Sequence, residues 1–207
     1  MSQNKINKKF VYLISPNEIE NDNFYTNLSM VLKSGKVGFF QLRLKKETNR
    51  NKLIIAKKIQ IICNKYKVKF LINDDPLLAK KINADGCHLG QKDMNLLKAR
   101  KILKKKIIGV TCHNSINLAK RAIKAGADYL AFGAFYSSKT KIVKYKANLT
   151  ILKSIKQITS IPIVAIGGIK LNNYKKLLLN KANFLAISGY IWNNKKYKPL
   201  DAIKKLK

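Results

Sequence analysis

The chain alternates short apolar runs with longer segments in which apolar residues recur at helical spacing. A short apolar run bounded by polar residues or glycine is typical of a buried strand, and apolar residues three or four positions apart are typical of one face of a helix. Strands are therefore predicted at residues 10–14, 37–46, 69–73, 86–89, 106–113, 128–132, 161–169 and 184–188. Helices are predicted near residues 24–33, 48–64, 76–82, 94–103, 114–125, 149–158, 172–180 and 199–206.

This alternation predicts an α/β fold with a parallel sheet, because each helix carries the chain back to the start of the next parallel strand. Eight such units within 207 residues favour a (β/α)8 TIM barrel over an open sheet. The sequence contains no linker or low-complexity tract, so we expect residues 1–207 to form a single domain.

Polar residues and glycines gather where the predicted strands end. In barrels of this kind the active site lies at the carboxyl ends of the strands. The candidate site residues at these positions are Gln41, Arg43, Lys45, Asn73, Asp74, Thr111, the loop from Ser137 to Lys141, Gly167, Gly168 and Ser188. In residues 37–46, an alternating pattern places Gln41, Arg43 and Lys45 on one face of the predicted strand.

Residues 70–93 combine two predicted strands with the helix between them, and they hold an unusual share of the acidic residues. The whole chain has ten Asp and Glu residues against 43 Lys and Arg residues, yet Asp74, Asp75, Asp85 and Asp93 all fall in this stretch. Acidic residues retained in so basic a chain are expected to have specific roles.

Asp74 and Asp93 follow neighbouring predicted strands, so their carboxylates are expected at one rim of the barrel. Hard oxygen ligands suit Mg²⁺, which is usually held by one or two carboxylates, several waters and the phosphate oxygens of a substrate. The sequence therefore predicts a magnesium site at Asp74 and Asp93. The alternative for Asp74 is that it caps the helix beginning at Pro76.

Two further groups of residues indicate phosphate binding. Arg43, Lys45 and Lys141 lie at three rim positions, where a guanidinium fork and two ammonium groups suit a polyphosphate. Gly167 and Gly168 end the seventh predicted strand, where barrels often bind a phosphate through backbone N–H groups. The alternative is that the double glycine only allows a tight turn.

The formal net charge of +33 raises the possibility of nucleic-acid binding. The excess is almost all lysine and is spread over every predicted helix, which favours a general compositional bias over a basic binding face. No apolar run is long enough to span a membrane, and the amino terminus lacks the apolar core of a signal peptide, so we expect a cytoplasmic protein without a membrane partner. Cys63, Cys87 and Cys112 are expected to be reduced thiols in the core.

The order and spacing of several motifs resemble thiamine phosphate synthase. These motifs are QLRLK, INDD, ADGCHLGQKD, IIGVTCH, AFGAFYSSKTK, IPIVAIGGI and LAISG, and the resemblance extends from about Val11 to Trp192. It implies a TIM barrel that joins 4-amino-5-hydroxymethyl-2-methylpyrimidine diphosphate to 4-methyl-5-(2-hydroxyethyl)thiazole phosphate, or its carboxylated form, and releases diphosphate. It also implies a Mg²⁺ cofactor and a homo-oligomer, with a dimer favoured.

The resemblance implies a role for each matching residue. Gln41, Arg43 and Lys45 resemble the contacts to the diphosphate and pyrimidine, Asn73 a pyrimidine contact, and Asp74 and Asp93 the metal ligands. Thr111 stands where the family usually has a serine near the pyrimidine. Ser138, Thr140 and Lys141 match a T-x-T-K loop in which Ser138 replaces the first threonine and Lys141 reaches the diphosphate. Gly168, Ile187 and Ser188 match the cradle of the thiazole phosphate. Arg43, Lys45 and Lys141 would stabilise the departing diphosphate and so carry catalysis.

Asp75 departs from the family pattern, which usually has an arginine there. The change removes a cation beside the metal, and it either weakens diphosphate binding or brings Asp75 into the metal shell. His88 and His113 are given no acid or base role, and His88 is expected to be a hydrogen-bonded histidine of the barrel.

Two other functions remain open at this point. A thiazole tautomerase on the same barrel would keep the thiazole-phosphate cradle and lose the metal and diphosphate groups, so the presence of Asp74, Asp93, Arg43, Lys45 and Lys141 argues against it. A basic nucleic-acid-binding barrel would show a continuous basic face with interleaved aromatics, whereas the tyrosines here are scattered.

Overall fold

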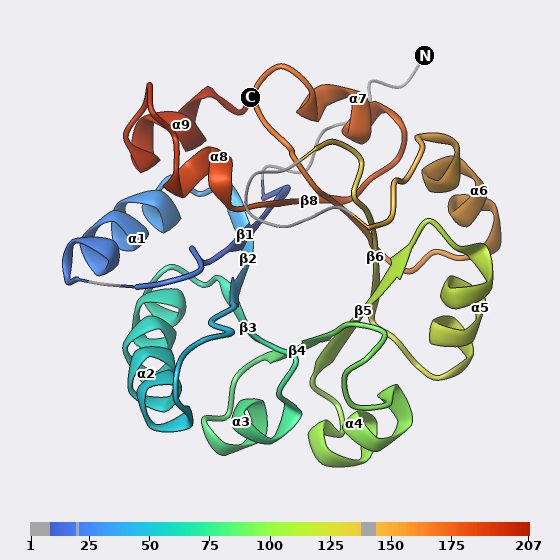
Figure 1. The fold of residues 1–207 in the computed structure, drawn as a ribbon, viewed down its shortest axis with the longest axis horizontal. Coiled ribbons are helices and arrows are strands. Elements are labelled where there is room, and N and C mark those ends of the chain that lie inside the picture. Colours follow the sequence, from blue (N-terminus) through green and yellow to red (C-terminus); the bar gives the residue numbers. More distant parts are fainter. Residues whose placement is uncertain (1–8, 20, 138–143) are drawn as a thin grey trace.

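The computed structural model describes residues 9–19, 21–137 and 144–207, and their strands form a closed parallel barrel in the order β1-β2-β3-β4-β5-β6-β7-β8. Helices surround the barrel on its outer side (Figure 1). The (β/α)8 architecture expected from the alternating pattern is confirmed.

The strands are β1 (Val11–Ile14), β2 (Val37–Leu42), β3 (Lys69–Asn73), β4 (Gly86–Leu89), β5 (Ile107–His113), β6 (Tyr129–Gly133), β7 (Ile163–Ile166) and β8 (Phe184–Ile187). The helices are α1 (Asn23–Lys33), α2 (Asn49–Lys65), α3 (Pro76–Lys81), α4 (Leu96–Leu103), α5 (Ile116–Lys124), α6 (Thr150–Ile158), α7 (Tyr174–Leu179), α8 (Gly189–Trp192) and α9 (Pro199–Lys205). Within the described ranges, no helix is long and apolar enough to cross a membrane.

Three elements differ from the sequence-based expectation by more than two residues. Strand β7 covers Ile163–Ile166 rather than residues 161–169, so Gly167 and Gly168 follow the strand. Strand β2 ends at Leu42 rather than Lys46, so Arg43 and Lys45 lie in the segment after the strand. The short helix α8 was not predicted; the indole Nε1 of Trp192, its last residue, donates to the carbonyl oxygen of Ile14 at 2.7 Å. This bond ties the end of the barrel to the end of its first strand.

The apolar residues form two clusters, separated by the wall of the barrel. The larger cluster lies between the strands and the surrounding helices and includes the buried and unpaired thiols of Cys63, Cys87 and Cys112, as predicted. The smaller cluster fills the barrel interior and contains Tyr12, Ile14, Leu71, Tyr129, Ala131, Val164 and Ala186. The interior is therefore a packed core, and ligands must bind at its rim.

One local motif occurs three times at the amino ends of the even-numbered strands. The side chains of Asp85, Asp128 and Asn183 accept the backbone N–H groups of Phe70, Ile108 and Ile163 at 2.9, 2.7 and 2.8 Å. Each bond joins the residue before an even-numbered strand to the preceding strand. Asp85 and Asp128 thus have structural roles at the end of the barrel opposite Asp74.

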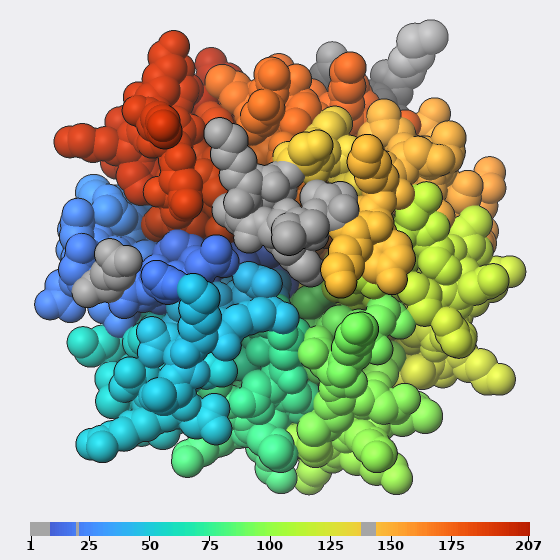
Figure 2. All heavy atoms as spheres, in the orientation of Figure 1, coloured from blue at the N-terminus to red at the C-terminus, as the bar shows by residue number. Residues whose placement is uncertain are grey.

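Strands β1 and β8 pair in parallel and close the barrel. In the space-filling view, the blue amino-terminal part of the chain meets the red carboxyl-terminal part on one side of the molecule (Figure 2). This closure brings the ends of β1, β2 and β8 to one rim.

Candidate active site

The carboxyl ends of β3 and β4 bring two carboxylates together at the rim. Asp74 follows β3 directly, and its N–H donates to the carbonyl oxygen of His88 in β4 at 2.8 Å. Asp93 lies after β4, and its Oδ2 accepts the N–H of Gly90 at 2.6 Å. Partial burial, together with the hydrogen-bonded and negatively charged Asp74 carboxyl group, raises the pKa of Asp93.

A cation lies beside this pair of carboxylates. The Nζ of Lys45 is 3.3 Å from the Oδ2 of Asp74. Among the described residues, no group of three or more His, Cys, Asp or Glu side chains could hold a metal ion. Two adjacent carboxylates nevertheless fit Mg²⁺, which takes most of its remaining ligands from water and substrate oxygens. Two carboxylates held close together repel each other, and the pKa shift that results is typical of metal-binding and catalytic sites.

Asp75 has a structural contact that its sequence position did not reveal. Its Oδ1 accepts the N–H of Leu78 at 2.8 Å and caps helix α3, in which Pro76 is the first residue. The alternative that Asp74 caps this helix is therefore wrong, because the capping residue is Asp75. The Asp75 carboxylate is committed to the helix amino terminus, which favours a negative charge.

We predict that Asp75→Asn leaves the activity within about twofold of the parent, because an asparagine oxygen caps a helix as well as an aspartate oxygen does. Asp75→Ala is expected to lower the free energy of unfolding by about 1 kcal/mol through loss of the cap. Urea denaturation and steady-state rates measure the two effects. A large loss of activity in the asparagine variant, without a loss of stability, would assign Asp75 to the metal shell instead.

Gln41 and Asn73 form a second polar group, directed into the barrel. The Nε2 of Gln41 donates to the Oδ1 of Asn73, and the Oε1 of Gln41 accepts the hydroxyl proton of Tyr12 at 2.8 Å. Gln41 is buried, with 3% of its surface exposed, so protein groups take most of its hydrogen bonds. Gln41 does not share one exposed face with Arg43 and Lys45, because β2 ends between them.

Arg43 is positioned by its backbone. Its N–H donates to the hydroxyl oxygen of Ser15 at 2.9 Å, and its guanidinium donates to the Oδ1 of Asn17 at 3.2 Å. Ser15 is 2% exposed and follows β1. A buried serine of one strand end therefore holds the start of the neighbouring loop, and the half-buried Arg43 side chain is left at the rim.

Thr111 lies on β5, and its hydroxyl is hydrogen-bonded to His88 in the neighbouring strand β4. The Nε2 of His88 is 2.8 Å from the Oγ1 of Thr111, and its Nδ1 is 2.8 Å from the hydroxyl of Tyr129. The expectation that His88 is a hydrogen-bonded barrel histidine is confirmed.

The double glycine is shaped by close backbone packing. Gly167 and Gly168 have φ angles of +104° and +59°, which favour glycine. A Cβ at Gly168 would lie 2.2 Å from the carbonyl oxygen of Ser137, and one at Gly167 would lie 2.3 Å from the Cβ of Ala134. The glycines thus let the segment after β6 lie directly against the turn after β7, and this alone accounts for them sterically.

Ser188 follows β8, and its hydroxyl donates to the carbonyl oxygen of Ser15 at 3.0 Å. Ile187 is buried with 2% exposure and packs in the larger apolar cluster, so its side chain is not available to a ligand. The ends of β1, β7 and β8 therefore offer mostly backbone groups at this part of the rim. The predicted site residues Ser138, Thr140 and Lys141 lie outside the described residues.

Comparison with known proteins decides the family. The family model described as thiamine monophosphate synthase matches residues 11–191. The chain belongs to the thiamine monophosphate synthase family.

Individual relatives agree with this assignment. The chain is 83% identical to a thiamine-phosphate synthase of Pelagibacter ubique over all of both chains, and 40% identical to one of Nitrosomonas eutropha, covering 88% of this chain and 86% of the relative. Among solved structures, a thiamine phosphate pyrophosphorylase from Pyrococcus furiosus superimposes with a TM-score of 0.83 at 27% identity, covering 98% of this chain and 96% of that chain. The family resemblance stated from the sequence motifs is thus confirmed.

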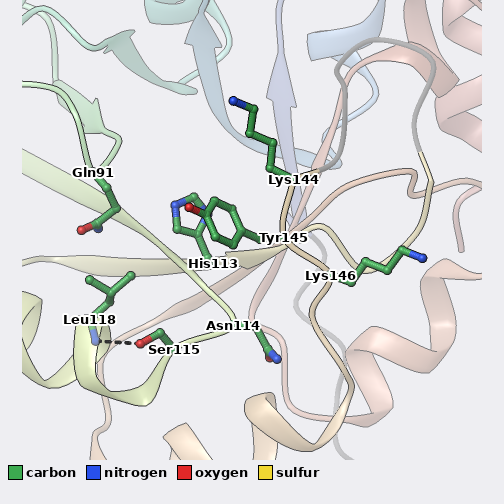
Figure 3. A pocket seen from close by; sticks show the side chains of 8 residues that line it. All are labelled: Gln91, His113, Asn114, Ser115, Leu118, Lys144, Tyr145 and Lys146. Carbon is green, nitrogen blue, oxygen red and sulfur yellow. Dashed lines mark hydrogen bonds between the residues drawn. The ribbon is translucent and has the colours of Figure 1, made fainter.

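Beside the strand ends of this family member lies a hollow of about 530 Å³ that the sequence did not indicate. Its lining includes Gln91, His113, Lys144, Tyr145 and Lys146 (Figure 3). The rings of His113 and Tyr145 stack with their centroids 4.1 Å apart, and the Gln91 side chain donates to the carbonyl oxygen of Thr111. The hollow therefore adjoins the Thr111 side of the rim.

Sequence reasoning also missed the buried polar residues that support the site, namely Ser15, Tyr12 and Tyr129. Each lies in or directly after an apolar strand, where a tyrosine or serine is usually a core residue. The motifs mark residues at strand ends, whereas the partners of those residues depend on which strands face one another across the barrel.

Proposed function

We propose that this transferase joins 4-amino-5-hydroxymethyl-2-methylpyrimidine diphosphate to 4-methyl-5-(2-hydroxyethyl)thiazole phosphate, or its carboxylated form, to give thiamine phosphate and diphosphate. The observation that carries the proposal is the pair of carboxylates, Asp74 and Asp93, with the Lys45 ammonium 3.3 Å from Asp74. Two carboxylates beside an ammonium group at the end of a barrel suit a diphosphate that is bound together with a metal ion. The reaction itself is inferred from membership of the thiamine monophosphate synthase family.

The diphosphate would lie over the ends of β2, β3 and β4. Asp74 and Asp93 would hold Mg²⁺, which supplies charge stabilisation to the diphosphate oxygens when it is bound. Lys45 would then exchange its contact with Asp74 for a diphosphate oxygen, and Arg43 would offer a second, forked contact. Lys141, which lies outside the described residues, is proposed as a third cation.

The pyrimidine would lie toward the barrel interior, between Asn73 and Gln41 on one side and Thr111 on the other. The thiazole phosphate would bind at the ends of β7 and β8, with Gly168, Ile187 and Ser188 offering backbone groups. Ser138 and Thr140, which lie outside the described residues, are proposed as substrate contacts from the family motif alone. These placements follow the family motifs and the positions of the strand ends.

The chemistry would be departure of the diphosphate followed by capture. Arg43, Lys45 and Lys141 stabilise the negative charge of the departing diphosphate, and the electron-rich aminopyrimidine stabilises the positive charge on its methylene carbon. The thiazole nitrogen, held nearby through its phosphate, then forms the new C–N bond. Leaving-group stabilisation and positioning suffice, so no nucleophilic side chain is required.

We also propose that the protein works as a homo-oligomer, with a dimer favoured, as the family resemblance implies. Its small-molecule substrates require no nucleic acid, and we propose that the positive charge has no specific nucleic-acid partner.

The proposal predicts that the purified protein forms thiamine phosphate only when both half-molecules and Mg²⁺ are present. Product formation is expected to stop with EDTA and to return when excess Mg²⁺ is added, because two carboxylates alone hold Mg²⁺ reversibly. Chromatography with fluorescence detection of oxidised thiamine phosphate measures the product. If thiazole phosphate binds but no product forms under any of these conditions, the synthase proposal is overturned and a tautomerase becomes the leading function.

A further inference from the structure

We propose that a chain of hydrogen bonds with one fixed direction crosses the barrel interior and sets which hydrogen-bonding groups Asn73 and Thr111 present to the pyrimidine. Tyr12, Tyr129 and His88 are the positioning residues of this chain. The inference rests on the proposed function, because the pyrimidine is the ligand that would meet its two ends.

The chain has six members, each from a different strand: Asn73, Gln41, Tyr12, Tyr129, His88 and Thr111. The Gln41 amide joins Asn73 to Tyr12, and the Tyr12 and Tyr129 hydroxyl oxygens are 2.7 Å apart. The Tyr129 hydroxyl is 2.8 Å from the Nδ1 of His88, and the Nε2 of His88 is 2.8 Å from the Oγ1 of Thr111. A continuous path thus links the ends of β3 and β5 through the centre of the barrel.

Counting protons along this path gives its direction. The Nε2 of Gln41 donates to Asn73, so the carbonyl Oε1 of Gln41 faces Tyr12 and accepts its proton. The single O–H of Tyr12 is then engaged with Gln41, so the Tyr12 oxygen must accept a hydrogen bond from the Tyr129 hydroxyl. Burial raises the pKa of both phenols, so each hydroxyl keeps its single proton.

The same count fixes the tautomer of His88. The Tyr129 hydroxyl donates its one hydrogen bond to Tyr12, so its oxygen accepts from the Nδ1–H of His88. In a neutral imidazole the Nε2 is then an acceptor, and the Thr111 hydroxyl donates to it. At the two ends, Asn73 is left with its N–H donors and Thr111 with the lone pairs of its oxygen.

The packing around Tyr129 is built to hold this path in place. Tyr129 is 3% exposed, and its ring stacks on the His88 ring with centroids 5.7 Å apart. Gly109 is paired with Tyr129 in the neighbouring strand, and a Cβ at Gly109 would lie 1.8 Å from the Cζ of the Tyr129 ring. Only glycine at this position lets the ring lie flat against β5 and bring its hydroxyl between Tyr12 and His88.

The direction matters for substrate choice. A 4-aminopyrimidine presents a ring-nitrogen acceptor next to an amino donor, which complements an Asn73 donor and a Thr111 acceptor. A 4-oxopyrimidine presents the opposite pattern, an N–H donor next to an oxygen acceptor. A site whose donors and acceptors are held in one direction rejects the reversed pattern, because it would leave buried polar groups unpaired.

The first test measures the His88 tautomer directly. The protein contains two histidines, His88 and His113. Long-range ¹H–¹⁵N correlation spectra of the parent and of His113→Gln therefore assign the His88 nitrogens without ambiguity. We expect protonated Nδ1 and unprotonated Nε2 in the parent at neutral pH. An Nε2–H tautomer means that the hydrogen bonds run in the opposite direction. A doubly protonated ring means that the Thr111 oxygen accepts from Nε2–H instead of donating to it. Either result overturns the proposal.

The second test uses Tyr129→Phe, which removes the central hydroxyl and keeps the ring. We expect KM for the pyrimidine diphosphate to rise about tenfold, the value of one lost hydrogen bond to a positioned group, while KM for the thiazole phosphate changes less than about twofold. We also expect the preference for the 4-amino over the 4-oxo pyrimidine diphosphate to fall about tenfold. The matched control is Tyr66→Phe, which removes a hydroxyl 2.8 Å from the Ser29 Oγ on the outer side of the barrel and should change neither value.

Equal losses for both substrates, or an unchanged preference between the two pyrimidines, would show a merely structural role and overturn the proposal. If the parent forms no thiamine phosphate, the proposed function has failed, and the spectra of the parent still decide whether the chain has the stated direction.

Discussion

Asp93→Asn is expected to lower kcat/KM for thiamine phosphate formation by about 100- to 1000-fold, because it removes one of two charged ligands from a site that must stabilise a departing diphosphate. The asparagine oxygen can still accept the N–H of Gly90, which Asp93 accepts at 2.6 Å, so the loop keeps its anchor. The loss should therefore come from the metal site and not from the fold.

The stability of Asp93→Asn shows whether the loss of activity comes from the metal site or from the fold. Burial and the Asp74 carboxyl group raise the pKa of Asp93, so its ionised form destabilises the folded protein at neutral pH, and this cost is relieved as the pH falls through the raised pKa. Asparagine carries no charge at any pH, so the variant should be at least as stable as the parent without metal. Thermal unfolding should also show that Mg²⁺ raises the Tm of the parent more than that of the variant.

Asp85→Asn is the matched control, because it makes the same chemical change at the opposite end of the barrel. Its oxygen can still accept the N–H of Phe70, as Asn183 does for Ile163 in the third copy of the motif. Activity within about twofold of the parent is expected, since only an exposed ion pair with Lys69 is lost. If Asp93→Asn keeps most of the activity and the full Mg²⁺-dependent rise in Tm, the metal assignment is wrong.

The second large effect is expected at the double glycine. Gly168→Ala places a Cβ 2.2 Å from the carbonyl oxygen of Ser137, a contact that only a backbone shift can relieve. Because the thiazole phosphate is proposed to bind at this turn, its KM should rise about tenfold or more, while KM for the pyrimidine diphosphate stays within about threefold. The strain is expected to cost about 2 to 3 kcal/mol of unfolding free energy.

Gly126→Ala controls for the backbone strain alone. Gly126 has a φ of +84°, in the same region as the +59° of Gly168, but a Cβ there meets nothing within 4 Å. The control should lose about 1 to 2 kcal/mol of stability without any change in either KM. Equal effects of Gly168→Ala on both substrates would place the thiazole phosphate away from this turn.

The motifs at the strand ends could be interpreted from the sequence alone, because each follows directly after an apolar run that predicts a strand. Alternating apolar runs and helical segments predicted all eight strands of the barrel, and the carboxyl ends of parallel strands necessarily share one rim. Asp74, Asp93 and Lys45 were therefore placed together from their positions after β2, β3 and β4. The ion pair between Lys45 and Asp74 agrees with that placement.

The sequence was less informative where a boundary between elements had to be placed to within a single residue. Either Asp74 or Asp75 suits the cap of α3, and the choice depends on the backbone angles at the end of β3. Asp74 has a φ of +65° and pairs its N–H with His88, which leaves Asp75 as the residue whose oxygen reaches Leu78. The same kind of uncertainty extended β2 to Lys46, because the alternating residues after Leu42 keep a strand-like pattern although they no longer pair.

The pattern of apolar runs and strand-end motifs was enough to predict a (β/α)8 barrel of this family and the rim on which its chemistry is proposed. The tertiary structure was needed for the hydrogen-bonded path from Asn73 to Thr111, because its members come from six strands and meet only when the barrel closes. It was also needed to show that Gly109 makes room for the Tyr129 ring. Contacts along the chain follow from local periodicity, whereas contacts across the interior of a barrel depend on the register of every strand between them.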